Sequence, residues 1–185
     1  MLTLLAPAQA GAADPEGRLL VFGDSFAVGT EPYMPKALPA WRVKQDVAVN
    51  RRARHAVRAL RNRKRIPRVI HISLGTVDDP GRRRAFRRSV RRTMRIVGPR
   101  RCVVWTNIFR PSREGEPSWE RLNRVLARQA GARDNLVIVD WFTMVQENPE
   151  WLRPEDGTHV TKRGYRQRAR AVADGARECR DRLAQ

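Results

Sequence analysis

The sequence predicts a doubly wound α/β domain with a parallel sheet, and two observations carry this prediction. Five short, nearly continuous apolar runs recur along the chain, and helix-like segments separate them. Such runs are typical of parallel strands that helices cover on both faces. Their alternation with helices favours right-handed crossovers between neighbouring strands. The length of 185 residues fits a single domain with a sizeable core.

The expected strands are the runs rich in Val, Ile and Leu: Arg18–Gly23, Arg42–Val49, Arg68–Leu74, Cys102–Ile108 and Leu136–Asp140. The expected helices are the segments that separate or follow them: Ala27–Leu38, Ala53–Arg63, Arg82–Val97, Ser118–Ala130 and Thr161–Leu183. In the second and third of these helices, apolar residues recur at helical spacing opposite arginines, which indicates one buried and one solvated face. Two polar stretches, Pro111–Pro117 and Asn148–Pro154, are expected to be loops.

Residues able to do chemistry follow several of the expected strands. Ser25 follows the first strand, Gly75–Asp79 the third, and Asn107 ends the fourth, while Asp156 and His159 come after the fifth. In open α/β sheets, ligands bind beyond the carboxyl ends of the strands. The sequence therefore predicts that these residues meet at one edge of the sheet.

Two short motifs supply the residues of a serine hydrolase. Gly23-Asp24-Ser25 closes the first apolar run, and Asp156-Gly157-Thr158-His159 precedes the last helix-like segment. In serine hydrolysis a His accepts the hydroxyl proton and an Asp holds the imidazole. We expect Ser25 to be the nucleophile, His159 the base and Asp156 its orienting carboxylate. Serine is also a common helix cap, but its combination with Asp-x-x-His favours catalysis.

These motifs resemble the SGNH/GDSL hydrolase family, from Leu19 to about Cys179. Gly23-Asp24-Ser25-Phe26 is similar to the family's nucleophile block, and residues 156–159 to its final block, which supplies the acid and the base. The resemblance implies a three-layer α/β/α sandwich with a flavodoxin-like, parallel five-stranded sheet. It also implies a serine esterase or acyl hydrolase of the exported bacterial type that needs no cofactor.

The chain departs from the family pattern where the oxyanion is held. The third block of the family reads Gly-x-Asn-Asp, but here Gly75-Thr76-Val77-Asp78 puts Val77 in place of the Asn donor. The second block's Gly is replaced near Asn50, whose backbone N–H could still donate because Asn tolerates unusual backbone angles. Losing one oxyanion donor costs about 10²–10³ in rate. Ser25, Asn50, Gly75 and Asn107 are the expected oxyanion or substrate-binding residues.

Three activities are compatible with these residues. The first is hydrolysis of an acyl or acetyl ester, on a small molecule or a polysaccharide, through Ser25, His159 and Asp156. The second is O-acyl transfer from the same site to a sugar hydroxyl. The third is a catalytically weakened, cationic module that binds a wall or surface, which the loss of the Asn donor favours. No metal site is expected, because the cysteines and histidines lack metal-ligand spacing.

The charge of the chain points to anionic partners. Its 38 basic and 19 acidic residues give a net charge of +19, which attracts polyanions. Arg51–Arg65 and Arg82–Arg95 hold the densest runs of arginine; each is either a solvated helix face or a surface that adheres to an anionic cell wall or membrane. There is no nucleic-acid-binding signature, so nucleic acid is not an expected partner. We expect a monomer.

The N-terminus and the cysteines suggest an exported protein. Residues 1–13 resemble the end of a secretory signal, with an apolar stretch before Ala8-Gln9-Ala10; a disordered tail is the alternative, and residues 14–185 form the expected domain. We expect a secreted or cell-envelope location. In an exported protein, Cys102 and Cys179 would form a disulfide between a central strand and the C-terminal helix; otherwise they are buried thiols.

Overall fold

The structure is a computed structural model that describes residues 16–112 and 114–185. The predicted signal remnant or tail at residues 1–13 lies outside the described residues. Among the described residues, no helix is both long and apolar enough to span a bilayer.

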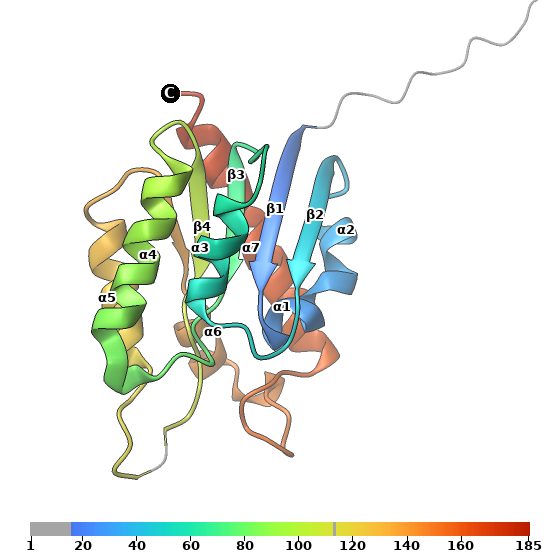
Figure 1. Ribbon diagram of the computed structural model, residues 1–185. Helices are drawn as coiled ribbons and strands as arrows, with labels where there is room; N and C mark the ends of the chain where they lie inside the picture. The colour runs from blue at the N-terminus through green and yellow to red at the C-terminus, as the bar shows by residue number, and fades with distance from the viewer. Residues whose placement is uncertain (1–15, 113) are drawn as a thin grey trace, which may run out of the picture.

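Five parallel strands form one sheet in the order β2-β1-β3-β4-β5 (Figure 1). The strands are β1 (Gly17–Gly23), β2 (Trp41–Val47), β3 (Val69–Ser73), β4 (Cys102–Thr106) and β5 (Leu136–Val139). This is the flavodoxin-like order. The chain goes from β1 to β2 on one side, crosses back over β1 to β3, and continues outward to β4 and β5. The predicted parallel five-stranded sheet is confirmed, with strand ends displaced by one or two residues.

Helices fill the connections, and short 3-10 turns join some of them. The helices are α1 (Ser25–Thr30), α2 (Met34–Ala37), α3 (Ala53–Arg61), α4 (Arg83–Val97), α5 (Glu120–Ala130), α6 (Trp141–Glu147) and α7 (Lys162–Arg182). The single helix predicted at Ala27–Leu38 is wrong. It is split into α1, a 3-10 turn and α2, because Pro32 and Pro35 begin new turns and cannot donate a backbone N–H.

The helix α6 was not predicted, although its start carries a signal. Asp140 is its N-cap, and the Asp140 carboxylate accepts a hydrogen bond from the backbone N–H of Thr143 at 3.3 Å. Asp is among the residues preferred at this position. The short length of α6 left only Trp141 and Val145 as an apolar stripe, too little for a periodicity.

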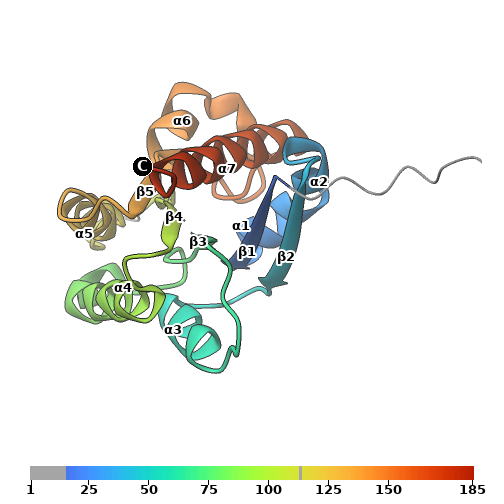
Figure 2. The same ribbon diagram turned by 90° about the horizontal axis from the view of Figure 1, so that it is seen from above.

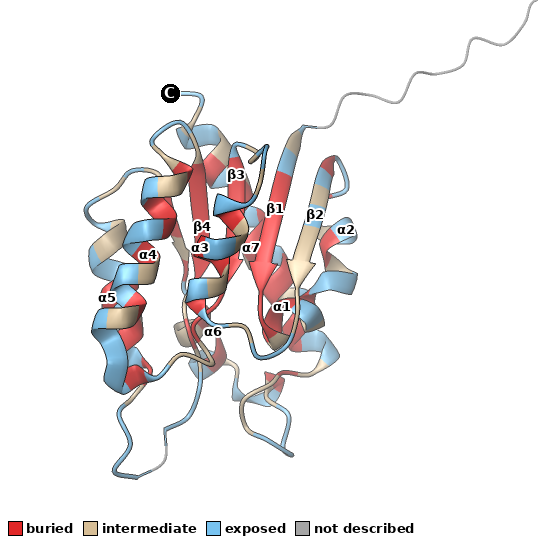
Figure 3. Ribbon diagram, viewed as in Figure 1, coloured by how far each residue is buried: buried red, intermediate tan, exposed pale blue. Residues whose placement is uncertain are grey.

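The three layers are a sheet between two helical faces (Figure 2). Helices α3, α4 and α5 pack on one face, where Phe22, Ile72 and Trp105 face them from the sheet. Helices α1, α2 and α7 cover the other face, and α6 lies beside α7. The central strands are buried while the helices alternate buried and exposed stripes (Figure 3), so the predicted α/β/α sandwich is confirmed.

Cys102 and Cys179 form a disulfide that joins β4 to α7. Both residues are fully buried in the core between the sheet and α7. The bond spans 77 residues of chain, so it ties the centre of the sheet to the last helix.

Candidate active site

Ser25 lies where β1 ends and α1 begins. Asp24 is the N-cap of α1, and its Oδ1 accepts a hydrogen bond from the Phe26 N–H at 3.1 Å. Ser25 is then the first residue of the helix, and N–H groups in a first helical turn have no partner within the helix. The strand-to-helix turn therefore presents both the hydroxyl and the backbone N–H of Ser25 at the carboxyl edge of the sheet.

Folding brings the three residues of the predicted triad into contact. Ser25 Oγ lies 2.8 Å from His159 Nε2, and His159 Nδ1 lies 2.7 Å from Asp156 Oδ2. Ser25 and His159 are 134 residues apart in the chain. The geometry suits a serine whose proton passes to an imidazole that a carboxylate orients.

A short closed loop holds His159 over Ser25. The backbone N–H of Arg153 donates to the carbonyl of His159 at 2.8 Å, and Thr161 N–H donates to the carbonyl of Trp151 at 2.7 Å. Buried Trp151 and Val160 anchor the base of this loop. The imidazole also stacks on the ring of Phe26 in α1, with centroids 5.1 Å apart. The loop that carries His159 and the helix that carries Ser25 therefore both orient the imidazole ring.

Asp156 is held as a carboxylate at the loop's tip. Partial burial raises its pKa, but hydrogen bonds from the Thr158 and His159 N–H groups and from the imidazole outweigh this and leave the pKa below its usual range. Ionised Asp156 accepts a hydrogen bond from the Nδ1–H group of His159. In the neutral imidazole this tautomer leaves Nε2 free to accept the Ser25 proton.

Two loops flank Ser25 because of the strand register. Gly23 pairs with Val47 of β2 and with Ser73 of β3, so the segments that follow these strands lie on either side of the nucleophile turn. The segment after β2 contains Asn50, and the segment after β3 contains Gly75. Asp78 ties the two together, because its Oδ2 accepts a hydrogen bond from the Ala53 N–H at 2.8 Å.

The backbone at Asn50 has a conformation that glycine adopts easily. Its φ is +60°, and Asn50 is the one non-glycine residue with positive φ in the described chain. Glycine, and Asn among other residues, adopt this left-handed region at least cost. Gly75 has φ +140°, and a Cβ there would collide with the Ile108 side chain, so packing as well as backbone conformation requires glycine at this position.

Asn107 binds neighbouring polypeptide rather than reaching toward Ser25. Its Nδ2 donates to Asp140 Oδ1 at 2.7 Å, and its Oδ1 accepts from the Phe142 N–H at 2.7 Å. These contacts fasten the end of β4 to the start of α6. The structure thus brings Ser25, His159 and Asp156 together and places the loops of Asn50 and Gly75 beside Ser25. The Asn107 amide instead connects β4 to α6.

Trp119, which precedes α5, and Trp151, which ends a 3-10 turn, both belong to the core. Both are buried, with 9% and 5% of their surface exposed. Trp151 stacks on Trp141 at 5.9 Å between centroids, and Arg110 covers Trp119 at 4.7 Å. Neither indole presents a face for a sugar.

Arg168 and Asp24 are two buried ionisable residues near the nucleophile, and their burial was not predicted from sequence. Arg168 of α7 is 3% exposed, its Nη2 donates to Ser73 Oγ at 2.8 Å, and its guanidinium stacks on the Phe26 and Trp141 rings. Burial lowers the pKa of Arg168 to about 10, and Asp24 opposes the shift. Burial raises the pKa of Asp24 to about 6, although Arg168 pulls it down. Arg168 thus lies below the ring that supports His159.

The raised pKa of Asp24 predicts a pH-dependent stability. The unfolded chain loses this proton near pH 3.8 and the folded chain near pH 6, so the free energy of unfolding falls as the pH rises through this window, by at most about 3 kcal/mol. Asp24→Asn keeps the acceptor for Phe26 and removes the titration. Thermal unfolding from pH 3.5 to 7 should show the wild type losing stability relative to this variant.

Asp134→Asn provides the matched control, because Asp134 is exposed. Its stability should follow the wild type at every pH. Parallel curves for the wild type and Asp24→Asn would show that Asp24 does not titrate in this range.

Comparison with known proteins rests on structure alone. No family model and no curated protein matches the sequence. The catalytic domain of peptidoglycan O-acetyltransferase A from Streptococcus pneumoniae has a TM-score of 0.74 at 17% identity, over 90% of this chain and 96% of that one. A lipolytic protein of the G-D-S-L family from Veillonella parvula gives 0.68 at 14% identity, over 84% and 94%.

TesA gives a TM-score of 0.65 at 18% identity, over 85% of this chain and 97% of the other. These neighbours include GDSL lipolytic proteins, and they match this chain over nearly their whole length. The chain therefore has the fold of the SGNH/GDSL hydrolases.

Proposed function

We propose that this protein is a serine esterase that removes an acyl or acetyl group through Ser25, His159 and Asp156. The observation that carries the proposal is the pair of contacts from Ser25 Oγ to His159 Nε2 at 2.8 Å and from His159 Nδ1 to Asp156 at 2.7 Å. The lipolytic and acyltransferase neighbours support an acyl-group chemistry.

The chemistry proceeds in two halves. Ser25 Oγ attacks the ester carbonyl while His159 Nε2 takes its proton, and His159 then gives that proton to the leaving alcohol as the acyl-enzyme forms. In the second half, water attacks the acyl-enzyme while His159 takes its proton; the acyl–Oγ bond then breaks, the acid leaves, and His159 returns the proton to Ser25 Oγ. The Ser25 N–H is the first donor to the oxyanion, and the left-handed Asn50 carries the second, through its backbone N–H.

Acyl transfer is the second candidate, and one observation favours it. The solved domain with a TM-score of 0.74 is named as a peptidoglycan O-acetyltransferase catalytic domain. Transfer differs from hydrolysis only in the second half, where a sugar hydroxyl replaces water. Product analysis with and without an oligosaccharide acceptor separates the two, because transfer yields an acylated sugar in place of free acid.

Covalent labelling tests the proposed nucleophile. A fluorophosphonate probe should label the wild-type protein on one residue, identified by peptide mass spectrometry as Ser25, because only a serine with an adjacent base attacks such a probe. Ser25→Ala should not react, and Ser112→Ala, which changes an exposed loop serine, should react like the wild type. Absence of labelling in folded wild type would instead support the weakened, cationic module.

The same proposal includes the location of the protein. A signal-like start and two cysteines that pair support export to an oxidising compartment, where disulfides persist. A wall-linked or small-molecule ester is the substrate class that fits this location.

A further inference from the structure

The net positive charge of this protein is confined to about one third of the chain. Residues 47–113 contain 21 of the 38 basic residues and only two of the 19 acidic ones, Asp78 and Asp79. The rest of the chain has 17 basic and 17 acidic residues. The segment therefore carries the entire net charge of +19. A compositional preference for arginine over lysine does not explain this distribution, because it does not remove acidic residues from one segment.

The helices of this segment are α3 and α4, which pack side by side on one face of the sheet (Figure 2). Neither helix contains an Asp or a Glu. The other long helices differ: in α5, Arg124 pairs with Glu120, and in α7, Arg177 pairs with Asp174 and Arg182 with Glu178. Concentrated like charge costs folding stability through self-repulsion, and a bound anion on α3 and α4 would offset this cost.

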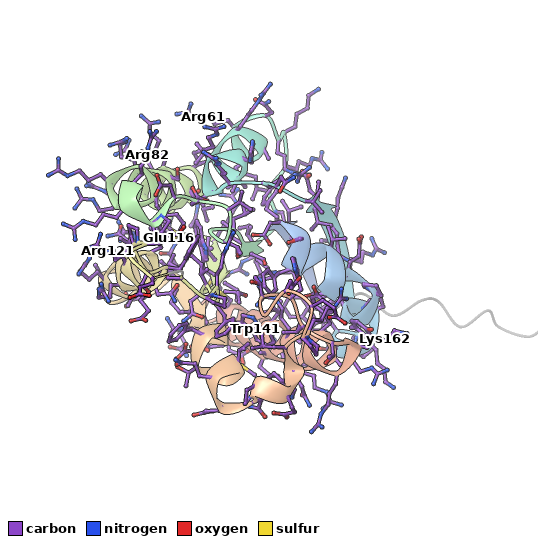
Figure 4. All side chains as sticks on the ribbon, turned by 90° about the horizontal axis from the view of Figure 1, so that it is seen from below. Arg61, Arg82, Glu116, Arg121, Trp141 and Lys162 are labelled. Carbon is purple, nitrogen blue, oxygen red and sulfur yellow. A yellow bond between two sulfur atoms is a disulfide. The ribbon has the colours of Figure 1, made fainter. Side chains whose placement is uncertain are left out.

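The two helices enclose a groove, which we name the arginine groove. Two adjoining hollows share Arg54, Ser89 and Arg92 and so form one depression. Its basic lining residues are Arg52, Arg54, Arg58, Arg61, Arg82, Arg88 and Arg92. Figure 4 shows Arg61, at the end of α3, and Arg82, just before α4, extending outward.

The arginines of the groove repeat along its length. Arg54, Arg58 and Arg61 on α3 are four and three residues apart, and Arg88 and Arg92 on α4 are four apart, so each set lies on one helix face about one turn, or about 5.4 Å, from the next. Among the described residues, no carboxylate pairs with any of these five. Their guanidinium groups are available to an external anion.

We propose that the arginine groove binds a linear polymer of phosphodiester groups that carries no bases, of the poly(alditol phosphate) kind. Guanidinium binds phosphate oxygens in pairs, and a row of such groups one helical turn apart matches a chain with regularly repeated phosphates. Proteins that bind single-stranded nucleic acid add exposed aromatic rings for the bases. The one aromatic side chain lining the groove, Phe86, is 1% exposed.

The groove begins beside the candidate active site. Its end at Arg52 and Asp78 belongs to the two loops that flank Ser25, and Asp78 joins those loops through the Ala53 N–H. Helices α3 and α4 both start at this edge and run away from it. A bound polymer would thus extend from the active-site edge along the face formed by α3 and α4. Such binding would hold the protein on the structure that carries the polymer.

Binding to a poly(glycerol phosphate) chain tests the proposal. All proteins carry Ser25→Ala, so hydrolysis plays no part and the result is independent of the proposed esterase activity. The triple substitution Arg54→Gln, Arg58→Gln and Arg92→Gln should raise Kd at least tenfold and make its salt dependence shallower, by about 2 in the log–log slope. The matched control substitutes Arg128, Arg163 and Arg170, which are exposed, and removes the same charge; its Kd should change less than threefold.

Three outcomes would overturn the proposal. Equal losses in the two triple variants would show attraction by net charge alone. Tighter groove-dependent binding of single-stranded DNA with the same number of phosphates would assign the groove to nucleic acid. Groove-dependent binding to phosphatidylglycerol vesicles, without binding to the polymer, would assign it to a membrane surface. Circular dichroism of both variants establishes that they remain folded.

Discussion

Ser25→Ala and His159→Ala are each expected to lower kcat/KM for a short-chain nitrophenyl ester by about 10⁴–10⁶-fold. This corresponds to about 5–8 kcal/mol of lost transition-state stabilisation. The loss is large because the hydroxyl and the imidazole act as one unit through their 2.8 Å contact. The double variant should lose little more than either single variant, since removing one partner already disables the other.

Asp156→Asn gives the sharper test of the geometry. The Asn oxygen can still accept the Thr158 and His159 N–H groups that Asp156 Oδ1 accepts at 2.8 Å, so the loop should keep its shape. The amide NH₂ then faces His159 Nδ1, where it favours an unprotonated Nδ1 and a protonated Nε2. The base becomes unable to accept the Ser25 proton, and kcat should fall about 10⁴-fold with KM nearly unchanged.

Controls separate this result from unfolding. Ser112→Ala changes an exposed loop serine that is not part of the triad, and its rate should equal that of the wild type. Melting temperatures of the three triad variants should lie within a few degrees of the wild type. Wild-type rates in any of them, measured on folded protein, would assign the ester hydrolysis to another residue or exclude it.

Loss of the disulfide should produce the largest change in stability. Cys102 and Cys179 are separated by 77 residues, and closing a loop of this length in the unfolded chain is worth about 4 kcal/mol. For a chain of this size, Cys102→Ala with Cys179→Ala should lower Tm by roughly 8–16 °C. The loss of packing between two fully buried sulfurs and their neighbours acts in the same direction.

Reduction distinguishes the covalent bond from the packing. Unreduced, denatured protein should contain no titratable thiol. Adding dithiothreitol should lower the Tm of the wild type toward that of the double alanine variant, and it should leave the variant unchanged. Two free thiols in unreduced protein would contradict the disulfide, and the two cysteines would then act as core residues.

The sheet was predictable because its strands are local apolar runs. Each run, such as Leu19–Phe22 or Val103–Trp105, is buried on both faces by helices, so its composition alone identifies it. The triad was predictable for a related reason: Ser25 and His159 stand in short motifs next to elements whose ends meet at one edge in any parallel sheet.

Two predictions about helices failed because the local sequence signal was short or ambiguous. The two prolines at positions 32 and 35 divided a segment whose apolar content suggested one helix. The seven residues of α6 are too few for a periodic pattern.

By itself the sequence determined the layers, the parallel sheet and the three residues that meet at its edge, because these follow from burial and from strand direction. Only the tertiary structure decided the buried position of Arg168 beneath Phe26 and the alignment of the arginines of α3 and α4 along one groove. Both depend on the distance between elements remote in the chain. Composition and spacing state which residues a helix carries, but the packing of one helix against another sets which side chains face each other and which charges remain without partners.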